Sequence, residues 1–224
     1  MPKKTFLGIF IFVIVVFPSV SLFCEKPQGY PKTFIVLKNL YNDKASEYLM
    51  YSQYSKRAYS EGYPRLGYLF RALASSESIC LENFRELLVD MGGQAKKVTK
   101  PKIKSSDTKA NLRNAINTEN RDINARYPSF IEKIKSEDRA GTLHVIKYAW
   151  KIKRQRLDLL QAGRSFIALA TSSSIKSLEE GAVKYFVCRI CGSIVVKLPE
   201  IICPVCSSSV SNYKEQERTE QYQQ

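Results

Sequence analysis

Histidine is almost absent from this chain, since its 224 residues include only His144. A metal site with two imidazole ligands from one chain is therefore excluded. Acidic residues are also scarce, with 21 Asp and Glu against 35 Lys and Arg and a formal net charge of +14. Such a surplus suggests nucleic-acid binding, but the basic stretch 96–104 is broken by Pro101 and lacks interleaved aromatic residues. We expect no nucleic-acid partner.

Residues 1–24 combine a basic start, "MPKK", with the apolar run Phe6–Phe23. This pattern is typical of an export signal. Three interpretations stay open: a cleaved signal peptide, a lipoprotein acylated at Cys24, or a retained membrane anchor. Phe23 stands where a lipoprotein signal prefers a small residue, and Pro18 interrupts the span that an anchor would need. All three predict an exported protein that is periplasmic or membrane-anchored.

Residues 33–171 carry apolar residues at helical spacing, with breaks at 60–64, near 95–106 and at 136–141. Ser106 or Asp107 is expected to cap the third helix. Its apolar stripe continues to Phe130, so one unbroken helix is predicted there. The stripe of the first helix is predicted to comprise Ile35, Leu37, Leu40, Tyr41, Ala45, Tyr48 and Leu49. Four such helices predict a four-helix bundle. Residues 37–47 and 112–122 also match as a weak repeat, which fits two duplicated helix pairs.

Four of the six cysteines form two Cys-x-x-Cys pairs, at Cys188 and Cys191 and at Cys203 and Cys206. Two such turns facing each other complete a tetrahedron of thiolates around one metal ion, iron or zinc. Two disulfides are the alternative in an exported protein. Short β-type runs surround the cysteines, so a small domain is predicted at 180–213, followed by a polar tail at 214–224.

Specific motifs accompany these cysteines: "FVCRICG" (186–192), "PEIICPVC" (199–206), "EGY" (61–63) and "ENRDINARYP" (119–128). In this order they resemble the rubrerythrin family, whose members join a ferritin-like four-helix bundle to a rubredoxin-like β domain. The resemblance covers about residues 34–213, and Ser207 departs from it where glycine is usual. It implies a mainly α fold, a homodimer, and a peroxide reductase that passes electrons from a thiolate-bound iron to a di-iron centre.

The bundle departs from the family's di-iron pattern, which is a ring of glutamates with one Glu-x-x-His on each of two helices. The pattern's positions fall on Lys44, Glu77, Cys80, Glu119, Asp122, Lys153 and Arg156. Lysine and arginine are protonated at neutral pH and repel a metal cation. The sequence therefore predicts that an ion-pair network replaces the di-iron centre, with Glu47 as a spare acid. A misregistered, solvated face and a single metal on Glu77, Cys80, Glu119 and Asp122 are the alternatives.

Two further residues have competing interpretations. Cys80 is read as a small core residue, against a peroxide-reactive thiol activated by nearby lysines. His144 falls off the ligand pattern and is read as structural.

Three functional hypotheses follow, and enzymatic activity stays open. The first is an exported electron-transfer protein with one iron in the four-cysteine site, an outside redox partner and a lost di-iron peroxidase centre, that is, a pseudoenzyme. The second is a zinc-stapled scaffold that binds a partner or an anionic membrane surface. The third is an active peroxide reductase with unusual ligands.

Overall fold

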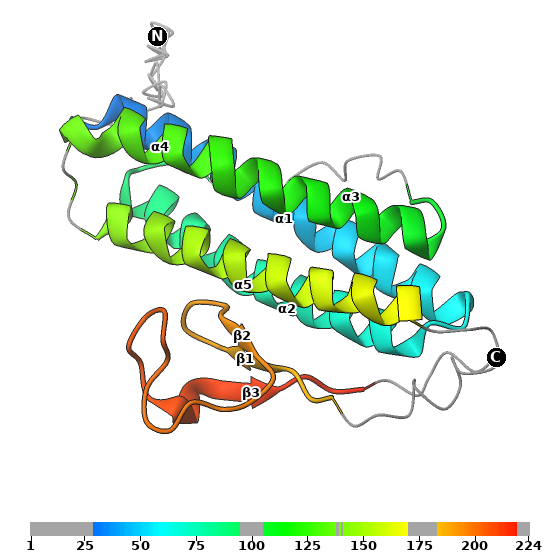
Figure 1. Cartoon of the computed structure of the whole chain (residues 1–224). Helices are drawn as coiled ribbons and strands as arrows, with labels where there is room; N and C mark the ends of the chain where they lie inside the picture. The colour runs from blue at the N-terminus through cyan, green and yellow to red at the C-terminus, as the bar shows by residue number, and fades with distance from the viewer. Residues whose placement is uncertain (1–28, 95–104, 138, 140, 170–182, 219–224) are drawn as a thin grey trace, which may run out of the picture.

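The computed structural model describes residues 29–94, 105–137, 139, 141–169 and 183–218. The long helices form an elongated bundle, and a small β domain lies along one side of it (Figure 1). The protein is therefore mainly α, as predicted. Its elements are α1 (Pro31–Ser60), α2 (Pro64–Asp90), α3 (Thr108–Arg121), η1 (Asp122–Arg126), α4 (Tyr127–Ile134), η2 (Lys135–Glu137), α5 (Thr142–Leu169), β1 (Phe186–Cys188), β2 (Ile194–Val195), η3 (Val210–Asn212) and β3 (Tyr213–Glu215).

The turns between helices follow the breaks in the sequence. Gly62 has φ +76° between α1 and α2, and Pro64 begins α2, where its missing N–H costs no hydrogen bond. Gly141 has φ +85° immediately before α5. Asp107 caps α3 by accepting a 2.8 Å hydrogen bond from the N–H of Ala110. Local chemistry therefore sets the end of α1 and the starts of α2, α3 and α5.

The third helix is not continuous, which corrects the sequence expectation. A π-helical turn, η1, separates α3 from α4, and the N–H of Tyr127 bonds five residues back to the carbonyl of Asp122. Pro128 follows directly and has no N–H to continue the α-helical pattern. The wider turn accommodates the proline, and it leaves Asp122 facing the bundle interior.

The inward face of α1 also differs from the predicted stripe. Ile35 is 48% exposed and Tyr48 is 39% exposed, so neither belongs to the core. Lys44, Glu47 and Tyr51 are buried instead. Hydrophobicity alone misplaces this face because its centre is polar, and the buried polar groups there are paired with one another.

The bundle interior has an apolar cluster at each end and a polar layer between them. One cluster includes Tyr51, Phe70 and Leu112, and the other includes Phe84 and Ile146. The positions between them along the helices are buried and charged: Lys44, Glu47, Glu77, Glu119, Asp122, Lys153 and Arg156. These seven residues are called the charge cluster below.

The small domain is a three-stranded antiparallel sheet in the order β2-β1-β3. β3 pairs Lys214 with Val187 and Glu215 with Phe186. The polar tail predicted at 214–224 therefore begins too early, since Lys214 and Glu215 belong to β3. Pairing with β1 satisfies the backbone hydrogen bonds of these two polar residues. Residues 219–224 lie outside the described part of the chain.

Within the described ranges, no helix is long and apolar enough to cross a membrane. The predicted signal or anchor at 1–24, including Cys24, lies outside these ranges, as do residues 170–182 between the bundle and the small domain.

Candidate metal site and a buried charge cluster

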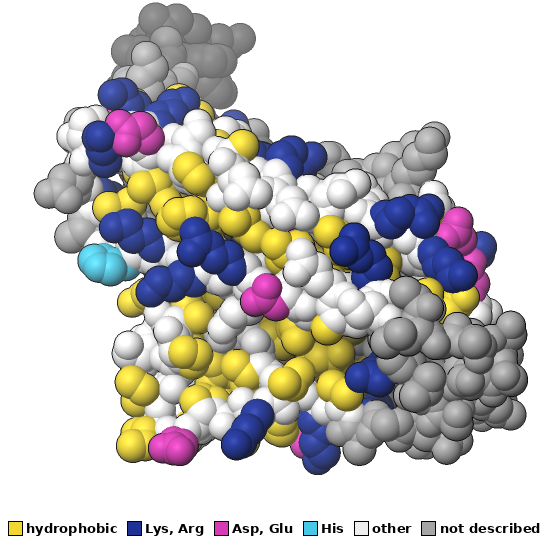
Figure 2. Space-filling model, viewed as in Figure 1, with side chains coloured by type: hydrophobic (Ala, Val, Ile, Leu, Met, Phe, Trp, Pro, Cys, Tyr) yellow, Lys and Arg dark blue, Asp and Glu magenta, His cyan; other side chains and the backbone are white. Residues whose placement is uncertain are grey.

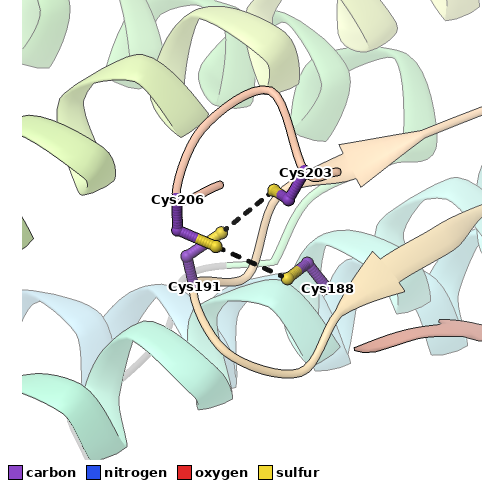
Figure 3. Close-up of side chains that lie close together, drawn as sticks. All are labelled: Cys188, Cys191, Cys203 and Cys206. Carbon is purple, nitrogen blue, oxygen red and sulfur yellow. Dashed lines mark hydrogen bonds between the residues drawn. The ribbon is translucent and has the colours of Figure 1, made fainter. Parts of the chain in front are cut away.

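The four predicted cysteine ligands converge on one point (Figure 3). All four Sγ atoms lie within 4.8 Å of one another. Two of the pairs join the two turns: Cys191 to Cys203 at 3.7 Å, and Cys188 to Cys206 at 3.9 Å. A metal bound to four sulfurs at about 2.3 Å makes a tetrahedron with edges of about 3.8 Å. The sulfur positions therefore fit one metal ion, and all four thiols are free of disulfides.

The two cysteine turns share one geometry. The N–H of Gly192 bonds to the carbonyl of Cys188 at 2.8 Å, and the N–H of Ser207 bonds to the carbonyl of Cys203 at 2.9 Å. Each turn ends in the left-handed region, with φ +84° at Gly192 and +59° at Ser207. Ser207 is the one non-glycine residue with positive φ among the described residues. Serine in place of glycine thus keeps the turn and its ligand but adds steric strain.

Hydroxyl groups surround the sulfurs. The hydroxyl of Tyr213 donates to Cys203 Sγ at 3.2 Å, and Ser208 Oγ lies 3.2 Å from Cys206 Sγ. Cys188 and Cys203 are fully buried, whereas Cys206 is partly exposed. Hydrogen bonds of this kind support thiolate ligands, and the partial exposure of Cys206 leaves one edge of the site near solvent.

Lys153 lies at the centre of the charge cluster. Its Nζ is 2.7 Å from Glu47 Oε1, 2.9 Å from Asp122 Oδ2 and 3.1 Å from Glu119 Oε2. These contacts bring α5 together with α1, α3 and η1. One ammonium group therefore binds three carboxylates from separate segments of the bundle.

Lys44 and Arg156 pair with the remaining acid. Lys44 Nζ lies 2.6 Å from Glu47 Oε2 and 3.1 Å from Glu77 Oε2, and Arg156 donates through Nη1 to Glu77 Oε1. The hydroxyl of Tyr51 donates to Glu119 at 2.7 Å. The cluster contains four carboxyl groups and three basic groups, so it is within one charge of neutrality without an ion.

The comparisons with known proteins can now be set beside this geometry. The Rubrerythrin family model matches residues 37–154, more than half of the chain. The chain belongs to the rubrerythrin family. The match runs from α1 into α5 and ends before the four cysteines.

Individual relatives agree with this assignment. Rubrerythrin-2 of Clostridium acetobutylicum is 24% identical over 170 residues, which cover 76% of this chain and 89% of the relative. Nigerythrin of Nitratidesulfovibrio vulgaris is 27% identical over 188 residues, or 83% and 87% of the two chains. The partially reduced structure of nigerythrin superposes with a TM-score of 0.70 at 23% identity, covering 82% of this chain and 86% of nigerythrin. The fully reduced, all-ferrous structure has a TM-score of 0.69 at 21% identity, covering 94% and 100%.

Of the seven residues that the rubrerythrin pattern assigns to the bundle site, six belong to the charge cluster, and the seventh, Cys80, contacts it. The Sγ of Cys80 lies 3.5 Å from Arg156 Nη2. All seven are buried, so they do not form a solvated face. The helical register taken from the rubrerythrin motifs therefore places these side chains together.

Glu47 is more important than its description as a spare acid suggested, because it contacts both lysines. The repeat contained the signal that could have identified it. In the alignment of residues 37–47 with 112–122, Glu47 stands opposite Asp122. Both carboxylates contact Lys153 in the structure. Tyr51 was also missed, and no signal in the sequence distinguishes it from an ordinary core tyrosine.

The charges of the cluster are set by burial and by neighbouring groups. Burial opposes the ammonium charge of Lys153, but Glu119 and Glu47 raise its pKa well above the ordinary value. Burial likewise disfavours ionised Glu47, yet Lys153 and Lys44 hold its pKa well below 4.5. Burial and the nearby Glu47 raise the pKa of Glu77 to about 7, against the pull of Arg156. Glu77 thus keeps its proton to a higher pH than Glu47, and its protonation removes one of the four formal negative charges of the cluster.

Cys80 and His144 lie in contrasting surroundings, one buried and one exposed. Burial raises the pKa of the Cys80 thiol, which opposes the formation of a reactive thiolate. His144 is exposed on the bundle surface, where Lys and Arg predominate over acidic side chains (Figure 2). His144 is therefore a surface residue, and the centre of its ring lies 6.5 Å from the centre of the Tyr148 ring.

Proposed function

We propose that this rubrerythrin-family protein is an exported one-electron transfer protein, with iron in its four-cysteine site and no di-iron peroxidase centre in its bundle. The observation that carries the proposal is the position of Lys153, whose ammonium group lies within 3.1 Å of three buried carboxylates. A metal ion held by those carboxylates would lie next to the ammonium group of Lys153, and the two positive charges would repel each other.

The basic side chains supply the countercharge that bound metal ions would otherwise supply. Removing a buried ion from a ring of carboxylates leaves an unpaired charge, which is strongly destabilising. Lys44, Lys153 and Arg156 neutralise those acids from within the chain. This arrangement supports a bundle that folds without metal and lacks the centre where the family reaction takes place.

The four-cysteine site is the part that retains redox chemistry. Iron held by four thiolates supplies a one-electron couple between Fe(III) and Fe(II). Tyr213 and Ser208 contribute hydrogen bonds around the sulfurs, and Cys206 gives the site an edge near solvent. These features support electron exchange with an outside partner protein.

Location and assembly follow from the sequence and the resemblance. The N-terminal segment supports export, with Cys24 as an acylation site or residues 1–24 as an anchor or cleaved signal. A homodimer is the assembly that the family resemblance implies.

Metal analysis, a visible spectrum and a peroxide assay test the proposal on the chain without residues 1–24, expressed with ample iron. We expect about one iron per chain, a red colour that bleaches on reduction, and negligible peroxide turnover. About three irons per chain would overturn the interpretation of the charge cluster. Zinc alone would instead support a stapled scaffold.

The peroxide assay also tests the remaining alternative, an active peroxide reductase with unusual ligands. If peroxide is turned over, Cys80→Ala and Glu119→Ala distinguish a thiol mechanism from a carboxylate-bound metal. Turnover that either substitution abolishes would contradict the loss of the peroxidase.

A further inference from the structure

One face of α2 donates hydrogen bonds to three successive carbonyls of the first cysteine turn. The Oγ of Ser76 donates to the carbonyl of Gly192, Cys80 Sγ to that of Cys191 at 3.4 Å, and Asn83 Nδ2 to that of Ile190 at 2.9 Å. The donors are spaced four and three residues apart, so they lie on one side of the helix. These three hydrogen bonds therefore hold the first cysteine turn, which carries Cys188 and Cys191, in a fixed position against α2.

The contact is close as well as polar. A Cβ added to Gly192 would lie 2.7 Å from the carbonyl oxygen of Ser76 and 3.1 Å from Cys80 Sγ. Glycine is thus required here by packing in addition to its positive φ. The backbone of the cysteine turn sits directly on α2.

Two of the three carbonyls belong to peptides whose N–H groups bond to metal-ligand sulfurs. Asn83 binds the carbonyl of Ile190, and the N–H of the same peptide, that of Cys191, bonds to the sulfur of Cys188. Ser76 binds the carbonyl of Gly192, and the N–H of that peptide, from Ser193, bonds to the sulfur of Cys191. Ser76 and Asn83 therefore each reach a sulfur through one peptide group.

Arg156 extends this chain of contacts to the charge cluster. Its Nη2 donates to Ser76 Oγ at 2.7 Å and its Nε does so at 3.2 Å, while Nη1 pairs with Glu77. The Ser76 hydroxyl accepts from a buried cation and donates toward the metal site. Arg156 stands where the family pattern has a metal ligand of the bundle. It thus supports the four-cysteine site instead, through Ser76.

We propose that Ser76 and Asn83, with Arg156 behind Ser76, are positioning residues that raise the reduction potential of the four-cysteine metal. Donation to a carbonyl polarises its peptide and strengthens the N–H bond at the other end. That N–H stabilises the additional negative charge of the reduced site, as does the buried cation. One electron enters from an external one-electron donor, and no bond is made or broken. The inference rests on the proposed electron-transfer function.

Ser76→Ala and Asn83→Ala test it on the iron-loaded chain, by reductive titration with an indicator dye. Each substitution is expected to lower the ratio of reduced to oxidised protein about threefold to tenfold at a fixed ambient potential, where tenfold corresponds to about 59 mV for one electron. Ser75→Ala is the matched control, because Ser75 bonds to the side-chain amide of Gln216 and not to the cysteine turn. It should leave the ratio unchanged.

Asn83 is partly exposed, so its variant is expected to fold even if the buried Ser76→Ala variant does not. Equal potentials in Asn83→Ala and the Ser75→Ala control would overturn the inference. If the unmodified chain shows no one-electron couple, the proposed function fails instead. The positioning role is then decided by cobalt(II) substitution: sulfur-to-cobalt absorption bands shifted in Asn83→Ala but not in Ser75→Ala support it, and identical bands refute it.

Discussion

The four-cysteine site and the charge cluster are two regions to which the family pattern assigns metal ions, and they have diverged. The four-cysteine site keeps every ligand, and its sulfurs are spaced as the edges of a tetrahedron. The charge cluster keeps acids but places Lys44, Lys153 and Arg156 among them. The comparison teaches that a buried ring of carboxylates needs positive charge from some source, and three basic side chains lie within contact of this one.

The two regions should therefore respond oppositely to metal removal and to mutation. Four thiolates have no internal cation, so we expect their domain to depend on a bound metal ion. The charge cluster depends on its own lysines and arginine. The predictions below test that contrast, from the largest expected effect to the smallest.

Loss of one thiolate should empty the four-cysteine site without unfolding the bundle. Metal binding to a structural thiolate site is worth on the order of 10 kcal/mol, and Cys203→Ser removes a fully buried ligand. We expect metal content near zero with the helical circular dichroism retained. Metal analysis and far-ultraviolet circular dichroism measure both. Concurrent loss of the helical signal would show that the bundle depends on the metal too.

Removal of the central lysine should destabilise the bundle with its metal content unchanged. Lys153→Met leaves three carboxylates without their shared cation, at a cost of about 3–5 kcal/mol. Urea unfolding followed by helical circular dichroism gives the free energy. Lys151→Met, on the exposed side of the same helix, is the control and should change little. Equal stability of the two variants would be evidence against the charge cluster.

Glu77 should make stability depend on pH between about 4.5 and 7. Its pKa is raised on folding, so the folded chain binds this proton more tightly and gains stability from it at low pH. As the pH rises through this window, the unfolding free energy of the unmodified chain should fall by up to about 3 kcal/mol relative to Glu77→Gln. Glu47, with a lowered pKa, loses its contribution only below 4.5. Parallel pH profiles would refute the assignment.

Relief of strain in the second cysteine turn should have the smallest effect. Ser207 has φ +59°, where a side chain is strained by about 1 kcal/mol, so Ser207→Gly should stabilise the small domain by up to that amount. Metal release to a chelator should slow accordingly. Ser211→Gly, at an exposed position without positive φ, should not slow it. Faster release from Ser207→Gly would contradict the strain.

Prediction from the sequence succeeded where the signal was local. Glycine, proline and a capping aspartate placed the helix ends, and cysteine spacing predicted that the four sulfur atoms come together. It failed where the signal depended on the neighbouring helix. Ile35 and Tyr48 are apolar enough for a core but lie off the inward face, and Pro128 turned one predicted helix into a helix with a π turn. The tail was predicted to begin at residue 214, inside β3. A short polar strand has no sequence signal of its own and becomes evident only when its pairing with β1 is seen.

The sequence by itself determined the order of the two domains, the two Cys-x-x-Cys pairs and the presence of cations at positions where the family pattern has metal ligands. Those properties depend on residue type and on spacing along one chain. Only the tertiary structure decided which carboxylate meets which cation, why Glu47 matters, and that Ser76 and Asn83 reach the cysteine turn. Such contacts join residues that are distant in sequence, and their energies arise from burial and proximity that no single segment contains.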